Sequence, residues 1–177
     1  MIHAFATLVT ATIFMTTQLI FDFQQSSDAS RWRVVDDVVM GGVSNGSISV
    51  NEEGHGVFSG SVSTDNNGGF SSIRSQVSGI EITDQRTVQL HIKGDGKEYQ
   101  FRLKANSRDY FSYIHSFSTS GAWETIELNL SDFYPSYRGR KLNQPNFNSR
   151  TFEEIAFLIA NGRDEQFELV IDKIELR

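Results

Sequence analysis

The chain has 177 residues, which is enough for one domain with a substantial core, and it contains no cysteine. The lack of cysteine excludes disulfides, thiol nucleophiles and thiolate metal sites. A net charge of −6, without any cluster of Lys and Arg, argues against nucleic-acid binding through the phosphate backbone. Fourteen Gly, fourteen Phe and only two Pro favour a β-sheet protein with many turns.

The first 17 residues differ from the rest. They are mostly apolar and rich in Thr, and no Lys or Arg precedes Arg31. Three interpretations stay open: a weak export signal, an extension ahead of a true start at Met15, or a short membrane anchor. We expect residues 1–17 to be a signal-like or disordered extension and residues 18–177 to form a single β-sandwich domain. The compartment, exported or cytoplasmic, stays open, with export slightly favoured.

Short strand patterns separated by turn residues fill the domain. We expect strands near residues 19–23, 44–50, 55–64, 69–76, 88–92, 99–103, 111–118, 123–130, 155–160 and 167–176. Between residues 88 and 103, apolar and polar residues alternate as in half-buried strands. Residues 94–96 predict a tight hairpin, and residues 120–121 predict the turn of another. A change of parity late in the last strand predicts a bulge near Asp172.

Residues 131–150 break this pattern and hold both prolines. A loop of that length is usually functional or loosely held. We expect one helical turn at residues 149–154, where this segment ends. About ten short strands and no long amphipathic helix predict an all-β fold, an antiparallel β-sandwich of the jelly-roll type, with under a tenth of the residues in helix.

Two shaped loops carry most of the functional signal. In residues 32–44, an apolar strand start runs into Asp36 and Asp37, and three apolar residues and two glycines follow. The second loop is residues 66–70, in which Asn66 and Asn67 precede a second pair of glycines. Asn and Gly are the residue types that tolerate positive φ. Two adjacent carboxylates beside the core need partners, because an unpaired buried charge is expensive. We therefore expect these two loops to meet.

Arg74 is the partner that the sequence offers for these carboxylates. It is the only cation between Arg33 and Arg86, and its planar fork can grip a carboxylate with two bonds. We predict that Arg74 donates to Asp36 or Asp37 as a structural pair. The alternative is a ligand site, in which the same side chains bind hydroxyls or charged groups of a partner.

Aromatic and basic side chains supply further candidates. An exposed row of aromatic rings would suit a glycan, whereas the alternative places Trp123 in the core and the tyrosines at ordinary edges. The members of this set are Tyr110, Tyr113, Trp123, Tyr134 and Tyr137. Arg138 and Arg140 could bind an acidic group or could dock the long loop. The adjacent carboxylates have the wrong spacing for glycoside hydrolysis, and no nucleophile motif is present, so we predict no catalytic residue.

Six motifs in a fixed order resemble the complex I intermediate-associated protein 30 family. They occupy residues 32–44, 58–60, 66–74, 93–96, 121–123 and 133–140, and the resemblance extends over about residues 19–176. It implies a galactose-binding-domain-like β-sandwich, similar to carbohydrate-binding modules. It also implies the family's role, in which mitochondrial members assist the assembly of respiratory complex I, the NADH:ubiquinone oxidoreductase.

This resemblance sets the functional expectation. We expect a non-enzymatic module without a cofactor that binds a protein partner as an assembly or stabilising factor. The alternative is a carbohydrate-binding module of an exported protein. We expect no nucleic-acid partner and membrane contact only through a partner. Sandwiches of this kind often hold calcium near the chain ends, which makes Asp22 and Asp172 weak candidate ligands. An aromatic row on a concave face would favour a glycan, and a flat apolar patch would favour a protein.

Overall fold

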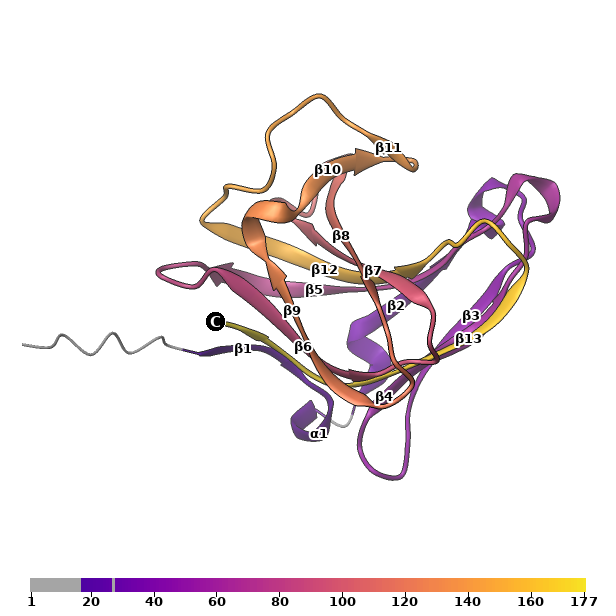
Figure 1. The fold of residues 1–177 in the computed structure, drawn as a ribbon, viewed down its shortest axis with the longest axis horizontal. Coiled ribbons are helices and arrows are strands. Elements are labelled where there is room, and N and C mark those ends of the chain that lie inside the picture. The colour runs from indigo at the N-terminus through magenta and orange to yellow at the C-terminus, as the bar shows by residue number, and fades with distance from the viewer. Residues whose placement is uncertain (1–16, 27) are drawn as a thin grey trace, which may run out of the picture.

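The computed structural model describes residues 17–26 and 28–177 and shows two antiparallel β-sheets packed against each other (Figure 1). The interpretations of residues 1–16 lie outside this described part. Its single α-helix, α1 (Phe23–Ser26), has only four residues. Short 3₁₀ turns occur at η1 (Ala29–Arg31), η2 (Asp37–Met40), η3 (Asp65–Asn67) and η4 (Leu130–Asp132). The all-β prediction is confirmed, and no helix of the described residues is long and apolar enough to cross a membrane.

Each sheet draws its strands from the whole length of the chain. The six-stranded sheet has the order β3 (Asn45–Val50), β4 (Gly56–Val62), β13 (Glu165–Leu176), β6 (Thr87–Lys93), β9 (Trp123–Asn129), with β1 (Gln18–Asp22) also paired to β13. The seven-stranded sheet has the order β11 (Arg140–Lys141), β10 (Tyr134–Tyr137), β8 (Ser112–Ser118), β7 (Glu98–Lys104), β12 (Thr151–Ile159), β5 (Ser71–Glu81), β2 (Trp32–Asp36). All the pairings are antiparallel, as the sequence predicted.

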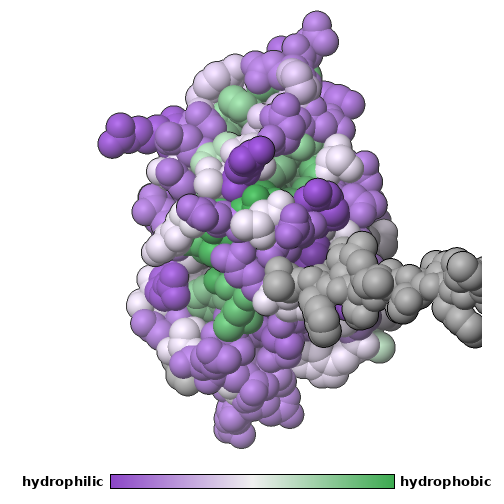
Figure 2. All heavy atoms as spheres, turned by 90° about the vertical axis from the view of Figure 1, so that its left-hand side faces the viewer, coloured by the Kyte–Doolittle hydropathy of each residue, from purple (hydrophilic) through white to green (hydrophobic). Residues whose placement is uncertain are grey.

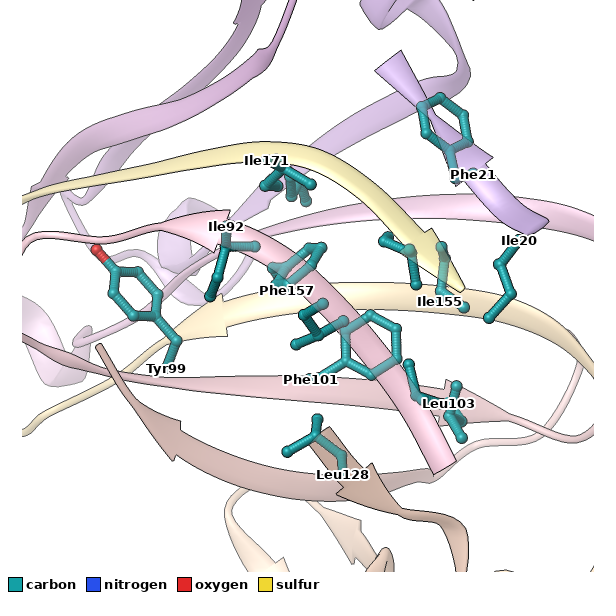
Figure 3. Close-up of a cluster of buried hydrophobic side chains, with 14 of the residues drawn as sticks. Ile20, Phe21, Ile92, Tyr99, Phe101, Leu103, Leu128, Ile155, Phe157 and Ile171 are labelled. Atoms are coloured by element: carbon teal, nitrogen blue, oxygen red, sulfur yellow. The ribbon is translucent and has the colours of Figure 1, made fainter. Parts of the chain in front are cut away.

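Side chains from both sheets form one apolar core (Figure 3). Phe101 of β7 and Phe157 of β12 are fully buried, with ring centroids 5.0 Å apart. Ile92 of β6 and Ile171 of β13 are buried in the same core from the other sheet. Successive side chains of a strand point to opposite faces, so every second residue enters the core and the residues between them face outward.

The chain crosses between the sheets at residues 94–96, where the sequence predicted a hairpin. That prediction is wrong, because β6 and β7 belong to different sheets. The Asp95 carboxylate accepts hydrogen bonds from the Tyr99 hydroxyl at 2.9 Å and from the Glu168 amide at 3.0 Å, which ties the crossing to β13. The turn at residues 120–121 also leads to the other sheet, because β9 pairs with β6 and not with β8.

Two local predictions near the C-terminus have opposite outcomes. The bulge near Asp172 is confirmed by a register shift between Ile171 and Lys173 in the pairing of β13 with β6. The helical turn at residues 149–154 is wrong, because β12 begins at Thr151 and pairs there with β5. Strand pairing satisfies the backbone groups that a helical turn would otherwise have bonded.

The long segment 131–150 contains a hairpin that was not predicted from the sequence. β10 pairs with β8 on one side and with β11 on the other. Arg138 and Gly139 join β10 to β11 with φ angles of 49° and 74°, as a two-residue hairpin turn requires. Arg seldom adopts positive φ, so the sequence carries little signal for this turn. Phe147 anchors the rest of the segment in the core.

One end of the sandwich presents mainly hydrophilic side chains. Figure 2 views the molecule from the left-hand side of Figure 1 and shows a narrow hydrophobic band bordered by hydrophilic residues. A hollow of about 680 Å³ lies where β5 ends and β12 begins, with Glu81, Ile82 and Arg150 in its lining. The Ile82 amide donates to the Arg150 carbonyl at 2.8 Å, which fixes the two segments together.

Candidate functional site

The two shaped loops meet at the end of the sandwich away from the C-terminus (Figure 1), as predicted. Asp37 joins them and is fully buried. Its Oδ2 accepts hydrogen bonds from the Gly69 amide at 2.6 Å and the Phe70 amide at 3.2 Å. Its Oδ1 accepts from the Ser44 amide at 3.0 Å, and the Ser44 hydroxyl donates to Oδ2. A buried carboxylate bonded mainly to backbone amides therefore organises both loops.

Arg74 is not the partner of either carboxylate. Asp36 accepts hydrogen bonds from the Gly46 amide at 2.9 Å and from the Ser71 hydroxyl at 2.6 Å. The predicted donation from Arg74 to Asp36 or Asp37 is wrong, because amides and serine hydroxyls already fill this role. Hydrogen bonds of this kind can stabilise a buried carboxylate without any cation.

Two glycines make room for the Asp37 carboxylate. A Cβ atom on Gly42 would lie 2.3 Å from Cγ of Asp37, and one on Gly68 would lie 2.6 Å from its Oδ2. Asn66 and Asn67, in η3 beside Gly68, are exposed and have φ angles of 55° and 60°. The Asn and Gly residues of both loops are thus explained by backbone conformation and by close approach.

Acid should weaken this arrangement. Burial alone would raise the pKa of Asp37, but hydrogen bonds from Ser44, Gly69 and Phe70 outweigh it and hold the pKa below its ordinary value of 3.8. A carboxyl whose pKa is lowered by folding contributes stability above its unfolded pKa and loses it as the pH falls through the folded pKa. We expect the free energy of unfolding to decline below about pH 4, and less steeply in Asp37→Asn. Urea denaturation of both proteins between about pH 6 and pH 3 checks this. An equal decline of the free energy of unfolding with falling pH in both proteins would contradict it.

Four apolar side chains that follow the buried Asp37 in the chain are exposed. Val38, Val39, Met40 and Val43 are 61%, 74%, 52% and 52% exposed, and we call them the apolar knuckle. η2 and the glycine turn after it carry them, and Asp37 fixes both. The sequence did not single them out, because an apolar run beside a strand is typical of core. Exposed apolar patches of this kind mark interaction sites.

The aromatic candidates do not form one row. Trp123 is 47% exposed on β9 and lies against the His55 ring, with centroids 4.7 Å apart, so the alternative that placed it in the core is wrong. Tyr113 of β8, in the other sheet, is half-buried against Phe147. Tyr134 is also half-buried, and the exposed Tyr110 and Tyr137 contact each other at a sheet edge.

The remaining predicted residues are dispersed. Arg138 and Arg140 are exposed at the β10–β11 turn, where Arg138 lies over the Tyr137 ring at 5.4 Å. Oδ1 of Asp22 accepts a hydrogen bond from the backbone amide of Gln25 at 3.1 Å, and Oδ1 of Asp172 lies 3.9 Å from Nε2 of His55. Within residues 17–26 and 28–177, no three His, Asp or Glu side chains are grouped so that they could hold a metal ion.

The outer face of the seven-stranded sheet carries a line of cations. In the strand register, Arg33 of β2 lies opposite Arg74 of β5. Ala156 of β12 lies opposite Arg74 on one side and opposite Arg102 of β7 on the other. Residues directly opposite each other share a face, so these three arginines follow one line across four strands. We call Arg33, Arg74 and Arg102 the arginine row.

The charges of the arginine row are poorly compensated. Arg102 donates from Nε and Nη2 to Oε1 of Gln100, a neutral acceptor, at 3.1 and 2.6 Å. Burial, and next the charge of Arg74, lower the pKa of Arg102 to about 10. Burial is also the main cause that lowers the pKa of Arg74. The negative charge of Glu154 raises this pKa, and the positive charge of Arg33 lowers it further. Among the described residues, the side chains of Arg33 and Arg74 make no hydrogen bond and no ion pair, although both backbones are paired within the sheet.

A hollow of about 340 Å³ lies over part of this row. Three of the five residues that line it are arginines and one is a carboxylate: Arg31, Arg33, Arg74, Gln76 and Glu154. The Glu154 carboxylate lies 3.8 Å from Nζ of Lys104 on the same face. All five lining residues are polar, and three of them are cations, so the hollow is polar and cationic.

Solved carbohydrate-binding modules share this fold. A family 11 module of a cellulosomal cellulase from Clostridium thermocellum is similar with a TM-score of 0.68 at 18% identity, covering 91% of this chain and 94% of that chain. A family 11 module solved with a β-1,3-1,4-mixed-linked tetrasaccharide gives 0.67 at 18% identity, covering 90% and 94%. A family 29 module complexed with cellulohexaose gives 0.57 at 12% identity, covering 91% and 89%. The jelly-roll prediction is confirmed, and at these identities the likeness concerns the fold alone.

Comparison at the sequence level identifies the family. No curated protein matches the chain. The family model described as complex I intermediate-associated protein 30 (CIA30) matches residues 21–171, most of the chain. The chain therefore belongs to the complex I intermediate-associated protein 30 family.

Proposed function

We propose that this chain is a non-enzymatic binding module that holds a protein partner as an assembly or stabilising factor. The apolar knuckle is the observation that carries this proposal. The family's name associates its members with intermediates of complex I, so assembly of the NADH dehydrogenase complex is the role that we infer. The five predicted aromatic residues do not form one row, because Trp123 lies on the six-stranded sheet and the tyrosines lie on or beside the seven-stranded sheet. An exposed apolar patch is present, which favours a protein over a glycan here.

The free energy of burying apolar side chains also supports the apolar knuckle as the binding surface. Full burial of an aliphatic side chain is worth about 1.5–3 kcal/mol, so a partner that covers the knuckle gains a substantial driving force. Binding also orders mobile groups, and that ordering opposes association. The loop that carries Val38 and Val39 is already fixed by the hydrogen bonds of Asp37, so little further ordering is needed. Rigid support and exposed apolar surface together describe a site prepared for a partner.

Serine substitutions in the knuckle should separate binding from stability. We expect the double variant Val38→Ser, Val39→Ser to change the free energy of unfolding by less than about 1 kcal/mol, because both side chains are mostly exposed. Affinity isolation of the native chain and of this variant, with quantitative mass spectrometry, tests the proposal. We expect a protein enriched by the native chain to be lost with the variant. Identical sets of co-isolated proteins would contradict it.

Glycan binding on the outer face of the seven-stranded sheet is a second candidate. The specific observation that favours it is the polar hollow beside Arg74 and Gln76, on a fold shared with modules solved with bound oligosaccharides. Electrophoresis through gels that contain soluble polysaccharides tests this candidate. Retarded migration in one of them supports it, and unretarded migration in neutral and acidic polysaccharides alike would contradict it.

A further inference from the structure

We propose that the arginine row binds the carboxylates of an acidic glycan, a polysaccharide that contains uronic acid residues. This inference rests on the second candidate function, glycan binding at this face, and adds the chemical class of the ligand. It starts from the arrangement of charge on the outer face of the seven-stranded sheet.

The positive charges of the arginine row repel one another, which destabilises the sheet. Neighbouring strands lie about 4.8 Å apart, and like charges directly opposite each other destabilise a sheet. Arg33 and Arg74 are directly opposite, and Arg74 and Arg102 are separated by Ala156 alone. The chain as a whole carries a net charge of −6, so this cationic face runs against the overall balance. A bound anion would remove the repulsion, as expected of a ligand site.

The compensation supplied by the protein itself is incomplete. Glu154 is the carboxylate in the lining of the hollow, and Lys104 already lies 3.8 Å from it. Gln100 holds Nε and Nη2 of Arg102 and so orients the guanidinium without neutralising its charge. A guanidinium presents parallel N–H groups that match the two oxygens of a carboxylate. The guanidinium groups of Arg33 and Arg74, and Nη1 of the oriented Arg102, therefore remain as donors for carboxylates.

The extent of the row indicates a chain with more than one carboxylate. Three strand spacings separate β2 from β7, which places Arg33 and Arg102 about 14 Å apart along the sheet. An extended ligand that crosses the strands would meet the arginines one after another. The amides of Gln76 and Gln100 beside the row can bond to hydroxyl groups, which a sugar chain presents at every unit.

Aromatic stacking contributes little at this face, and charge takes its place. Tyr134 shares the outer face with Arg102. Ile114 of β8 lies opposite Tyr134 of β10 on one side and opposite Arg102 of β7 on the other. Nζ of Lys141 lies 5.0 Å from the centre of the Tyr134 ring, so the ring already has a cation over it. A neutral glucan depends on stacking and hydrogen bonds alone, whereas a polyuronate adds ion pairs with the row.

Calorimetric titration of the full chain tests this inference with three probes. They are a galacturonic acid oligosaccharide, a neutral mixed-linked β-glucan oligosaccharide and an oligoglutamate peptide of similar length. We expect the oligogalacturonate to bind at least about tenfold more tightly than either other probe. We also expect its affinity to fall as NaCl is raised from about 0.05 to 0.5 M, because salt screens ion pairs at a surface.

Matched variants connect this binding to the row. Arg74→Gln and Arg102→Gln should each weaken oligogalacturonate binding at least about tenfold. Arg108→Gln removes an exposed arginine away from the row and should leave the affinity unchanged. Urea midpoints no lower than that of the native chain are expected for both row variants, because they relieve repulsion. If either row variant unfolds, Arg74→Lys serves in its place. This variant keeps the positive charge but lacks the parallel N–H groups of the guanidinium, so it should still bind oligogalacturonate more weakly.

The outcomes separate this inference from the function on which it rests. Binding of the neutral glucan alone, unaffected by Arg74→Gln, overturns the acidic-glycan inference and leaves glycan binding standing. Equal binding of oligoglutamate and oligogalacturonate overturns the assignment to a glycan. An absence of binding to all three probes overturns the inference and the second candidate function together.

Discussion

Replacement of Asp37 by Ala should lower the free energy of unfolding by roughly 3–5 kcal/mol. The variant would bury the amides of Ser44, Gly69 and Phe70 without the acceptor that each now has. A buried donor left unsatisfied costs about 1–3 kcal/mol, and partial entry of water reduces the sum. The contact between the two shaped loops would also be weakened, because the bonds from Gly69 and Phe70 to this carboxylate are lost and only the bond from the Asp37 amide to the Phe70 carbonyl and the contacts of Asp36 with Ser71 are kept. Urea denaturation at neutral pH measures the effect.

Asp36 provides the matched control for this experiment. It adjoins Asp37 and is half-buried, and its carboxylate accepts hydrogen bonds from the Gly46 amide and the Ser71 hydroxyl. We expect Asp36→Ala to lower the free energy of unfolding by about 1–2 kcal/mol, because water can reach the groups left behind. Equal losses for the two variants would show that Asp37 has no special role in joining the loops.

Gly42→Ala should be the second severe substitution, with a loss of roughly 3 kcal/mol. The new Cβ would lie 2.3 Å from Cγ and Oδ1 of Asp37, which forces the carboxylate or the loop to move. Movement of the carboxylate weakens its hydrogen bonds to Ser44 and Gly69, so the steric penalty and the bonding penalty act together.

Gly41→Ala is the control for the second prediction. Gly41 has a φ of 92°, and a Cβ there would meet nothing within 4 Å, so only backbone strain opposes the substitution. That strain is worth about 1–2 kcal/mol. Urea midpoints of Gly41→Ala and Gly42→Ala, compared where the denaturant slopes of the two unfolding transitions agree, distinguish backbone strain from close approach to Asp37. A Gly41 variant less stable than the Gly42 variant would contradict the close approach to Asp37.

The strands could be predicted from the sequence more reliably than their partners. Alternation such as that of Phe101 and Leu103 with Arg102 reveals a half-buried strand, and the structure confirms it. Local turn residues do not reveal which sheet the next strand joins. Residues 94–96 have hairpin composition, yet the chain crosses there to the other sheet, because Asp95 bonds to an amide of β13 that lies 73 positions away.

The candidate site could be predicted only in part for the same reason. The meeting of the two loops follows from adjacent carboxylates and glycine pairs, which are visible in the sequence. The partners of Asp37 are three backbone amides and the Ser44 hydroxyl. Backbone amides carry no sequence signature, so Arg74 was the wrong choice. Arg33, Arg74 and Arg102 come from three separate strands, and only the register places them in one line.

Photocrosslinking at the apolar knuckle tests the central claim, that this surface holds a protein partner, most directly. A photoreactive amino acid would replace Val39 in the full chain produced in its own cells, and Glu52, exposed in the turn between β3 and β4, would be the control position. Our account expects one discrete adduct from position 39 that is absent at position 52 and disappears when Asp37→Ala displaces the loop. Adducts that are the same at both positions, or that persist with Asp37→Ala, would contradict it.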